Sequence, residues 1–162
     1  MIINKRQGFG LIVISLIVAM ILKIAPWPGF FMPFNPDWVL LTLIYWALAS
    51  PEKTGIISAW TVGLLTDALT GRLLGQLALT YPLVIYFCIK KHKRLNQFPL
   101  VQQLLFILFL LLLAQFLVFW IENFHKGISF SLTFWLPAFS GTLIWPLIFT
   151  LMREVRAPRK PK

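Results

Sequence analysis

The chain has 162 residues, of which 59% are hydrophobic and 12% charged, with a formal net charge of +10 and a mean hydropathy of +0.81. Soluble domains are about 45–50% apolar and about 25% charged, so a small water-exposed domain has too little core to cover this much apolar surface. The composition excludes an ordinary soluble domain and favours an all-α integral membrane protein with the bilayer as its solvent. The basic excess does not indicate nucleic-acid binding, because it lies in short gaps between apolar runs.

The first apolar run, residues 8–25, follows Lys5 and Arg6. It is longer than the core of a secretory signal peptide, and the sequence PWP follows it in place of a small-residue cleavage site. We therefore expect an uncleaved membrane span, followed by an aromatic, proline-rich loop at the outer interface. This loop is either an ordinary aromatic belt or a docking surface for another membrane protein. Its candidate contact residues are Trp27, Pro28, Pro36, Asp37 and Trp38.

The next two runs, residues 37–50 and 54–70, form a tight helical hairpin, since only Ser-Pro-Glu-Lys separates them. Both are short for a hydrocarbon layer of about 30 Å. Short spans imply either local thinning of the bilayer or burial behind neighbouring helices.

A row of small residues with one carboxylate runs through GIISAWTVGLLTDALTGRLLG, residues 55–75. Every fourth residue stays on one side of a helix for several turns, and small residues there allow another helix to approach closely. The approaching helix belongs either to this chain or to a partner. Together with the neighbouring arginine, the candidate packing or partner-contact residues are Gly55, Ala59, Gly63, Asp67, Gly71, Arg72 and Gly75.

Asp67 is the least expected member of this row, because a carboxylate in an apolar segment is costly unless it is paired, solvated or protonated. It is expected to accept hydrogen bonds from Arg72, or from backbone N–H groups freed where Gly71 and Gly75 end the helix. Either arrangement makes Asp67 an internal polar clasp of the turn. A ligand or proton site and a partner contact are the alternatives.

Three further runs, residues 73–90, 100–121 and 132–152, follow. Five or six spans are both compatible with these runs, and a single six-span domain over residues 1–162 fits better. The fifth run ends at Glu122, at a depth similar to that of Asp67. Residues 153–162 form a basic tail, and no internal repeat is visible.

The charges between the runs indicate the orientation, because cytoplasmic segments of membrane proteins carry the excess of Lys and Arg. With six spans and the N-terminus inside, three basic residues lie outside: Lys23, Arg72 and Lys126. The other twelve of the fifteen lie inside. Both termini and the tail 153–162 are therefore predicted to be cytoplasmic.

The sequence predicts no catalytic, cofactor or metal site. Its single cysteine, Cys88, is read as apolar filler. The two histidines, His92 and His125, fall on opposite sides of the membrane and cannot share a metal or a proton. No glycine-rich phosphate loop followed by Lys is present.

Several segments in order resemble the MreD family of bacterial rod shape-determining proteins. They are PWP, PDWVLLTLIYWALA, TDALTGRLLG, VFWIENF and WPLIFTLMREVR, and the likeness covers nearly the whole chain. The resemblance implies a multi-pass protein of the bacterial inner membrane, without catalytic activity, needed for rod shape and lateral peptidoglycan synthesis. It also implies a six-helix fold like the substrate-binding subunits of energy-coupling-factor transporters.

The partners that the resemblance implies are MreC, the MreB filament, the RodA-type glycan polymerase and its penicillin-binding transpeptidase. We therefore expect a membrane scaffold that binds a single-span MreC-like protein and membrane lipids, but no nucleic acid. The alternative is a transporter subunit that binds a small molecule or lipid. A membrane enzyme is the third class considered, and no cluster of residues supports it.

Overall fold

The computed structural model describes residues 5–127 and 131–156, and within these ranges all regular secondary structure is helical. The α-helices are α1 (Lys5–Ile24), α2 (Trp38–Ala49), α3 (Ile56–Thr70), α4 (Gln76–Leu95), α5 (Leu100–Lys126) and α6 (Leu136–Arg156). Two short 3-10 helices, η1 (Met32–Phe34) and η2 (Leu132–Trp135), precede α2 and α6.

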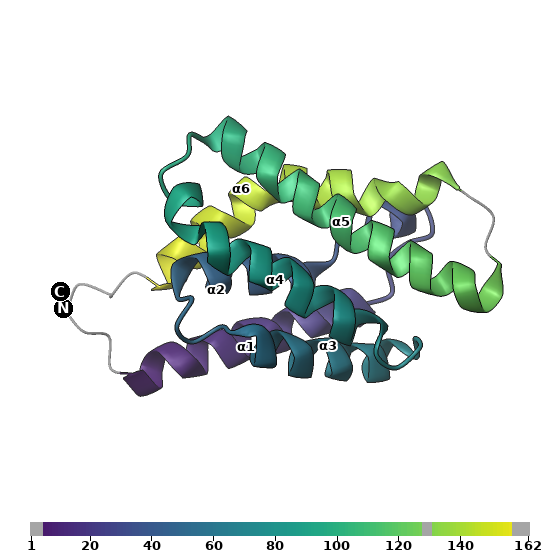
Figure 1. Ribbon diagram of the computed structural model, residues 1–162, viewed down its shortest axis with the longest axis horizontal. Helices are drawn as coiled ribbons and strands as arrows, with labels where there is room; N and C mark the ends of the chain where they lie inside the picture. Colours follow the sequence, from purple (N-terminus) through teal and green to yellow (C-terminus); the bar gives the residue numbers. More distant parts are fainter. Residues whose placement is uncertain (1–4, 128–130, 157–162) are drawn as a thin grey trace.

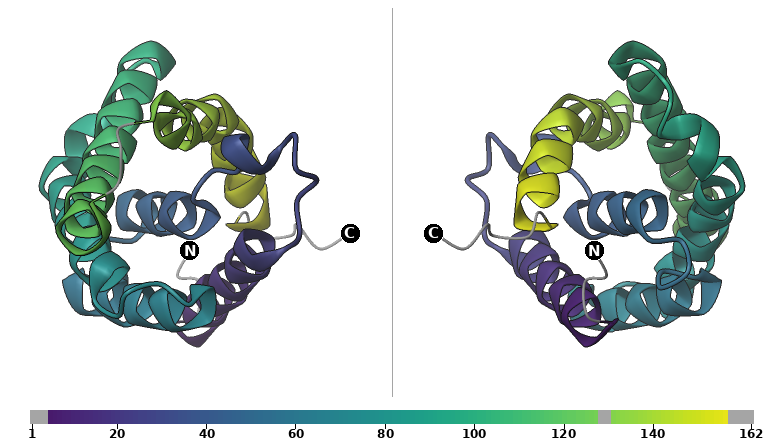
Figure 2. Two further views of the ribbon diagram at one scale, coloured as in Figure 1. Left: turned by 90° about the vertical axis from the view of Figure 1, so that its right-hand side faces the viewer. Right: turned by 90° about the vertical axis from the view of Figure 1, so that its left-hand side faces the viewer.

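Consecutive helices run in opposite directions along the long axis, so the first turn of α1 and the last turn of α6 lie at the same end (Figure 1). Five helices form an open ring around α2 (Figure 2). Within the ring α1 contacts α3, α3 contacts α4, α4 contacts α5 and α5 contacts α6. Between α6 and α1 there is no packing of comparable extent, and a groove lies between them.

The central helix α2 is short because it lies inside the protein. Every residue from Val39 to Leu48 is buried. A helix that is apolar on all sides has no face for water and is stable only when other helices surround it. Asp37 begins the helix by accepting a hydrogen bond from the Leu40 N–H at 3.2 Å. A short second run was expected to reflect either local thinning of the bilayer or burial behind neighbouring helices. The structure shows that α2 is buried behind its neighbours.

The outer faces of the ring helices carry large apolar side chains that no other part of the chain covers. Examples are Ile14 and Ile21 on α1, Ile57 and Leu65 on α3, Leu79 and Leu83 on α4, Leu105 and Phe109 on α5, and Leu143 and Leu147 on α6. By length and composition two stretches are able to cross a membrane, Leu100–His125 and Leu132–Arg156, and two shorter apolar helices are Gly8–Ile24 and Ile56–Thr70. An apolar surface of this extent is typical of a protein dissolved in lipid.

The six helices lie where the six apolar runs were expected, but α1 begins before its run and three helices continue beyond the ends of theirs. α4 continues to Leu95, α5 to Lys126 and α6 to Arg156. The basic segment 90–94, expected in a connecting gap, therefore lies on the last turns of α4, and Arg153 begins the last turn of α6 instead of a separate tail. A helix does not have to stop where its apolar run stops, because basic residues stabilise the last turn of a helix. The rest of the expected tail, 157–162, lies outside the described residues.

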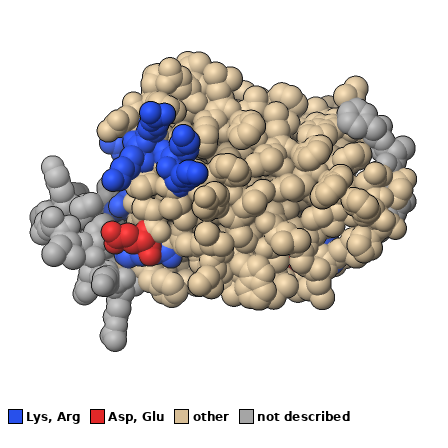
Figure 3. All heavy atoms as spheres, viewed as in Figure 1, with Lys and Arg blue, Asp and Glu red and all other residues tan. Residues whose placement is uncertain are grey.

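Basic residues gather at one end of the molecule. Figure 3 shows Lys and Arg at the end where α1 begins and α6 ends, while the remainder of this face is almost free of charge. Near the opposite end, Lys23 is in an ion pair with Asp37 and Arg72 is in an ion pair with Glu122.

Candidate functional site

The carboxylate of Asp67 binds the first turn of the next helix. It lies on α3, is fully buried, and accepts hydrogen bonds from the backbone N–H groups of Gly75 and Leu77 at 3.0 Å and of Ala78 at 3.3 Å. The first N–H groups of a helix have no partner within the helix and carry partial positive charge. Asp67 therefore caps α4 from a neighbouring helix, and the backbone alternative of the predicted clasp is confirmed.

Two glycines shape the turn that brings α4 to Asp67. Gly71, which ends α3, has φ +64°, and Gly75, which precedes α4, has φ +102°. Glycine adopts such left-handed conformations without the steric cost that a Cβ adds.

The small residues of α3 are packed against α4 within the same chain. A Cβ at Gly63 would lie 2.6 Å from the Leu77 carbonyl oxygen and 2.8 Å from the Cα of Ala78, so the two backbones touch there. Ala59 is fully buried. Gly55 has open space around it at the start of α3. The surface of α3 at Ala59, Gly63 and Asp67 is thus occupied by this chain.

Arg72 does not reach Asp67. Its guanidinium contacts the Glu122 carboxylate of α5 at 3.3 Å. Glu122 also accepts a hydrogen bond at 3.0 Å from Gln76, whose side-chain amide donates a second one to the Val118 carbonyl oxygen at 3.3 Å. This network ties the α3–α4 turn to the end of α5.

A second polar cluster, which the sequence reasoning missed as a unit, joins α1, α2 and α4. The Lys23 ammonium lies 2.9 Å from an Asp37 carboxylate oxygen and donates to the Tyr81 hydroxyl at 2.9 Å, and that hydroxyl in turn donates to Asp37 at 2.9 Å. Tyr81 is fully buried. A lysine at the end of an apolar run needs an acidic partner, so the sequence could have predicted an ion pair for Lys23. No feature of the sequence near Tyr81 indicated that its hydroxyl would join this cluster.

The outer loop folds back on the ends of α1 and α2. The indole rings of Trp27 and Trp38 are stacked, with centroids 6.2 Å apart and planes at 11°. Trp27 donates to the Leu22 carbonyl oxygen at 3.1 Å. Pro36 is buried while Pro28 is exposed. The five loop residues predicted as contacts therefore have different roles. Pro36 and Asp37 hold the loop in place, and Trp27 and Trp38 cover the ends of α1 and α2.

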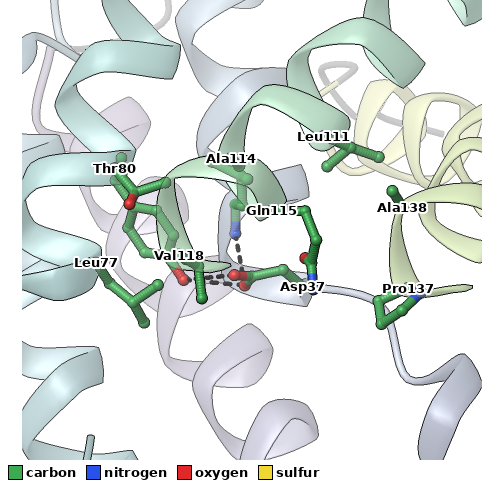
Figure 4. A pocket seen from close by; sticks show the side chains of 11 residues that line it. Asp37, Leu77, Thr80, Leu111, Ala114, Gln115, Val118, Pro137 and Ala138 are labelled. Atoms are coloured by element: carbon green, nitrogen blue, oxygen red, sulfur yellow. Dashed lines mark hydrogen bonds between the residues drawn. The ribbon is translucent and has the colours of Figure 1, made fainter. Parts of the chain in front are cut away.

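A small cavity lies beside Asp37. Figure 4 shows Asp37 among side chains from three helices, including Thr80 of α4, Gln115 of α5 and Pro137 of α6. Its volume of about 20 Å³ is room for one water molecule. Sites for drug-sized ligands have about 300–1,000 Å³. This cavity therefore offers no place for a vitamin-sized molecule.

A larger groove follows the open side of the ring, between α1 and α6. It has a volume of about 350 Å³ and is lined almost entirely by apolar side chains. Ile14 and Val18 form one wall, Leu147 and Leu151 the other, and Trp38 and Thr42 of α2 lie between them. The Ser15 hydroxyl in this groove already accepts a hydrogen bond from the Trp46 indole at 2.8 Å. The groove opens on the lateral surface of the helix bundle, where the exposed apolar side chains of α1 and α6 lie.

The remaining chemistry-bearing residues are dispersed. His92 lies near the end of α4 and His125 near the end of α5, at opposite ends of the molecule. Cys88 is buried. Within residues 5–127 and 131–156 no three His, Cys, Asp or Glu side chains are grouped so that they could hold a metal ion.

Comparison with known proteins identifies the family. The family model for the rod shape-determining protein MreD matches residues 4–155. A curated relative, the rod shape-determining protein MreD of Haemophilus influenzae, is 34% identical over 140 residues, which is 86% of each chain. No solved structure matches the chain. With a match over nearly its whole length and with helices apolar enough to cross a membrane, the chain belongs to the MreD family of rod shape-determining membrane proteins.

Proposed function

We propose that this chain is a non-catalytic, six-pass scaffold of the inner membrane that takes part in cell elongation by holding a single-span partner of the MreC kind. The apolar ring surface supports six passes, including α3, whose 15 residues span only about 22 Å. The even number of helices and the basic end support a cytoplasmic location of both termini. Through this partner the scaffold would act on lateral peptidoglycan synthesis, together with the MreB filament, the RodA-type polymerase and its transpeptidase.

The observation that carries the proposal is the groove between α1 and α6. Elsewhere around the ring neighbouring helices contact each other, and α3 uses its small residues against α4. The groove is long, aliphatic and open to the side, and its polar group Ser15 is already bonded. Helices associate in lipid through close van der Waals packing, so a partner's apolar helix fits such a surface. Trp38 links the groove to the outer aromatic loop, which would contact the partner where it leaves the membrane.

The groove is tested by filling it. Val18→Trp and Leu147→Trp place large rings on its two walls, and Leu83→Trp places one on the exposed face of α4 as the matched control. Co-purification of an MreC-like partner from detergent should fall by about tenfold for the groove variants, a loss of about 1.4 kcal/mol in binding free energy, and stay unchanged for the control. A substitution at Gly63 does not serve this test, because it disturbs α4 of the same chain.

Unchanged recovery of the partner with both groove variants, at normal protein levels, would exclude this groove as the docking surface. Photocrosslinking from positions 65 and 105, on the exposed faces of α3 and α5, would then show whether the partner lies elsewhere on the ring.

A further inference from the structure

A polar pocket lies at the basic end of the molecule, where α2 ends and the last turns of α6 pass the turn between α4 and α5. Its volume is about 350 Å³. Tyr45, Leu48 and Ala49 come from α2, Asn96 from the α4–α5 turn, and Phe149, Arg153 and Arg156 from α6. None of these residues belongs to the groove or to the clusters around Asp67 and Asp37.

The two arginines of this pocket have no carboxylate partner in the part of the chain that the structure describes. They are three residues apart, which places them on the same face of α6. The described ion pairs use Asp37 and Glu122, and Asp67 is occupied by backbone N–H groups. The other two acids, Glu52 and Glu154, are exposed and do not line the pocket. Two guanidinium groups thus face one pocket without a neutralising charge.

The other polar groups of the pocket add hydrogen-bond donors. The Tyr45 side chain is buried, and it lines the pocket together with Arg153 and Arg156. One amide hydrogen of Asn96 is donated to the Leu48 carbonyl oxygen at the end of α2, at 3.2 Å, so this carbonyl does not need an arginine. The Asn96 amide has a second hydrogen to donate. An arginine beside Tyr45 leaves the hydroxyl proton free for an external acceptor.

The remaining walls are apolar, and they point to a lipid. Leu48, Ala49 and Phe149 form the floor, and the Phe149 ring packs edge-on against the Tyr45 ring with centroids 5.8 Å apart. A molecule that places an anion between the guanidinium groups would also meet this apolar floor.

Basic residues in the last turn of a helix also stabilise that helix, and a general attraction to anionic lipid follows from any cationic end. Neither effect requires a pocket. Arginine binds phosphate through two parallel hydrogen bonds, and basic pockets between helices on the cytoplasmic side select anionic headgroups.

We propose that Tyr45, Asn96, Arg153 and Arg156 form a binding site for the phosphate of an anionic phospholipid of the inner leaflet. The phosphodiester would lie between the two guanidinium groups and accept a hydrogen bond from Tyr45. Its apolar part would meet the floor formed by Leu48, Ala49 and Phe149. The residues of this site are separate from those that line the groove between α1 and α6.

The test compares two charge-matched double variants of the full chain. Arg153→Gln with Arg156→Gln removes the pocket cations, and Lys91→Gln with Lys93→Gln removes the same charge from exposed positions of α4 at the same end. Each protein is reconstituted in phosphatidylcholine containing about one fifth phosphatidylglycerol, and retained lipid is measured by native mass spectrometry. We expect phosphatidylglycerol retention to fall by at least about fivefold in the arginine variant and to stay within about twofold in the lysine variant.

Two further measurements separate the possible outcomes. Tyr45→Phe, which removes only the hydroxyl, should reduce retention by about two- to fivefold without unfolding the protein. Competition with inorganic phosphate identifies the source of the anion. An equal fall in both double variants would overturn the pocket in favour of general attraction, and binding of inorganic phosphate without preference for phosphatidylglycerol would overturn the assignment to a lipid.

Discussion

Asp67 shows how a costly residue in an apolar helix is used for structure. Its two oxygens meet three N–H groups at the start of α4, and the negative charge faces the positive end of that helix dipole. The charge is therefore satisfied without a cation, and the arginine five residues later is free to pair with Glu122. The carboxylate at this depth needs no ligand or proton to account for it.

Replacement of Asp67 should accordingly act through stability. Asp67→Ala leaves three buried N–H groups without an acceptor and should lower the free energy of unfolding by about 3 kcal/mol, with Asp67→Asn intermediate because one oxygen remains. Unfolding in mixed detergent micelles measures this. Glu122→Gln is the control, expected to cost about 1 kcal/mol or less, because its partner Arg72 is partly exposed.

The outcome that contradicts this account is a normally stable Asp67→Asn protein, present at normal levels, in cells that lose rod shape. The charge would then act directly in function.

At the scale of helices, the contact between α3 and α4 depends on a single missing side chain. Gly63 lies where the α4 backbone crosses, at Leu77 and Ala78, and the Asp67 cap lies one turn further along α3. The cap and the close approach thus support each other, since the N–H groups come within reach only when the two backbones are near.

Gly63→Ala should therefore be strongly destabilising for so small a change. The added methyl group meets backbone atoms that cannot rotate away, so we expect a loss of about 2–3 kcal/mol. Gly10→Ala is the matched control, because a Cβ at Gly10 on α1 has nothing within 4 Å and alanine favours helix by about 0.5–1 kcal/mol. Thermal unfolding in detergent distinguishes the two, and equal melting temperatures would mean that α3 and α4 can separate without cost.

At the scale of the whole molecule, the two ends differ in the pairing of their described basic side chains. The described basic side chains at the ends of α4 and α6 have no ion-pair partner among the described residues, whereas Lys23 and Arg72 are paired. This asymmetry predicts that the cationic end faces the cytoplasm.

The orientation can be measured with single cysteines, because the native Cys88 is buried. Glu52→Cys in the α2–α3 turn should stay unlabelled by a membrane-impermeant maleimide in intact cells, whereas Leu74→Cys in the α3–α4 turn should be labelled. Both residues are exposed, so accessibility within the protein is matched. Labelling at position 52 alone in intact cells would reverse the topology, and labelling at both positions or at neither would mean that α3 does not cross the membrane.

The sequence by itself predicted an apolar solvent, six long helices and the approximate position of each along the chain, but not where α4, α5 and α6 end. These properties depend on local features: the length of each apolar run, the glycines that end α3 and precede α4, and the aspartate that begins α2. The clasp at Asp67 could also be predicted from the sequence, because Asp67 and the N–H groups that it binds lie within twelve residues of each other.

Only the tertiary structure decided which helix is central and which surfaces are free. The runs of α2 and α3 are both short and apolar. In the structure the other five helices surround α2, whereas one side of α3 is exposed. Lys23, Asp37 and Tyr81 meet because three helices converge, as do Tyr45, Asn96 and the two arginines of α6. Such contacts join residues up to about a hundred positions apart, and no local pattern specifies them, because in a helix bundle the partner of each face depends on the packing of all the others.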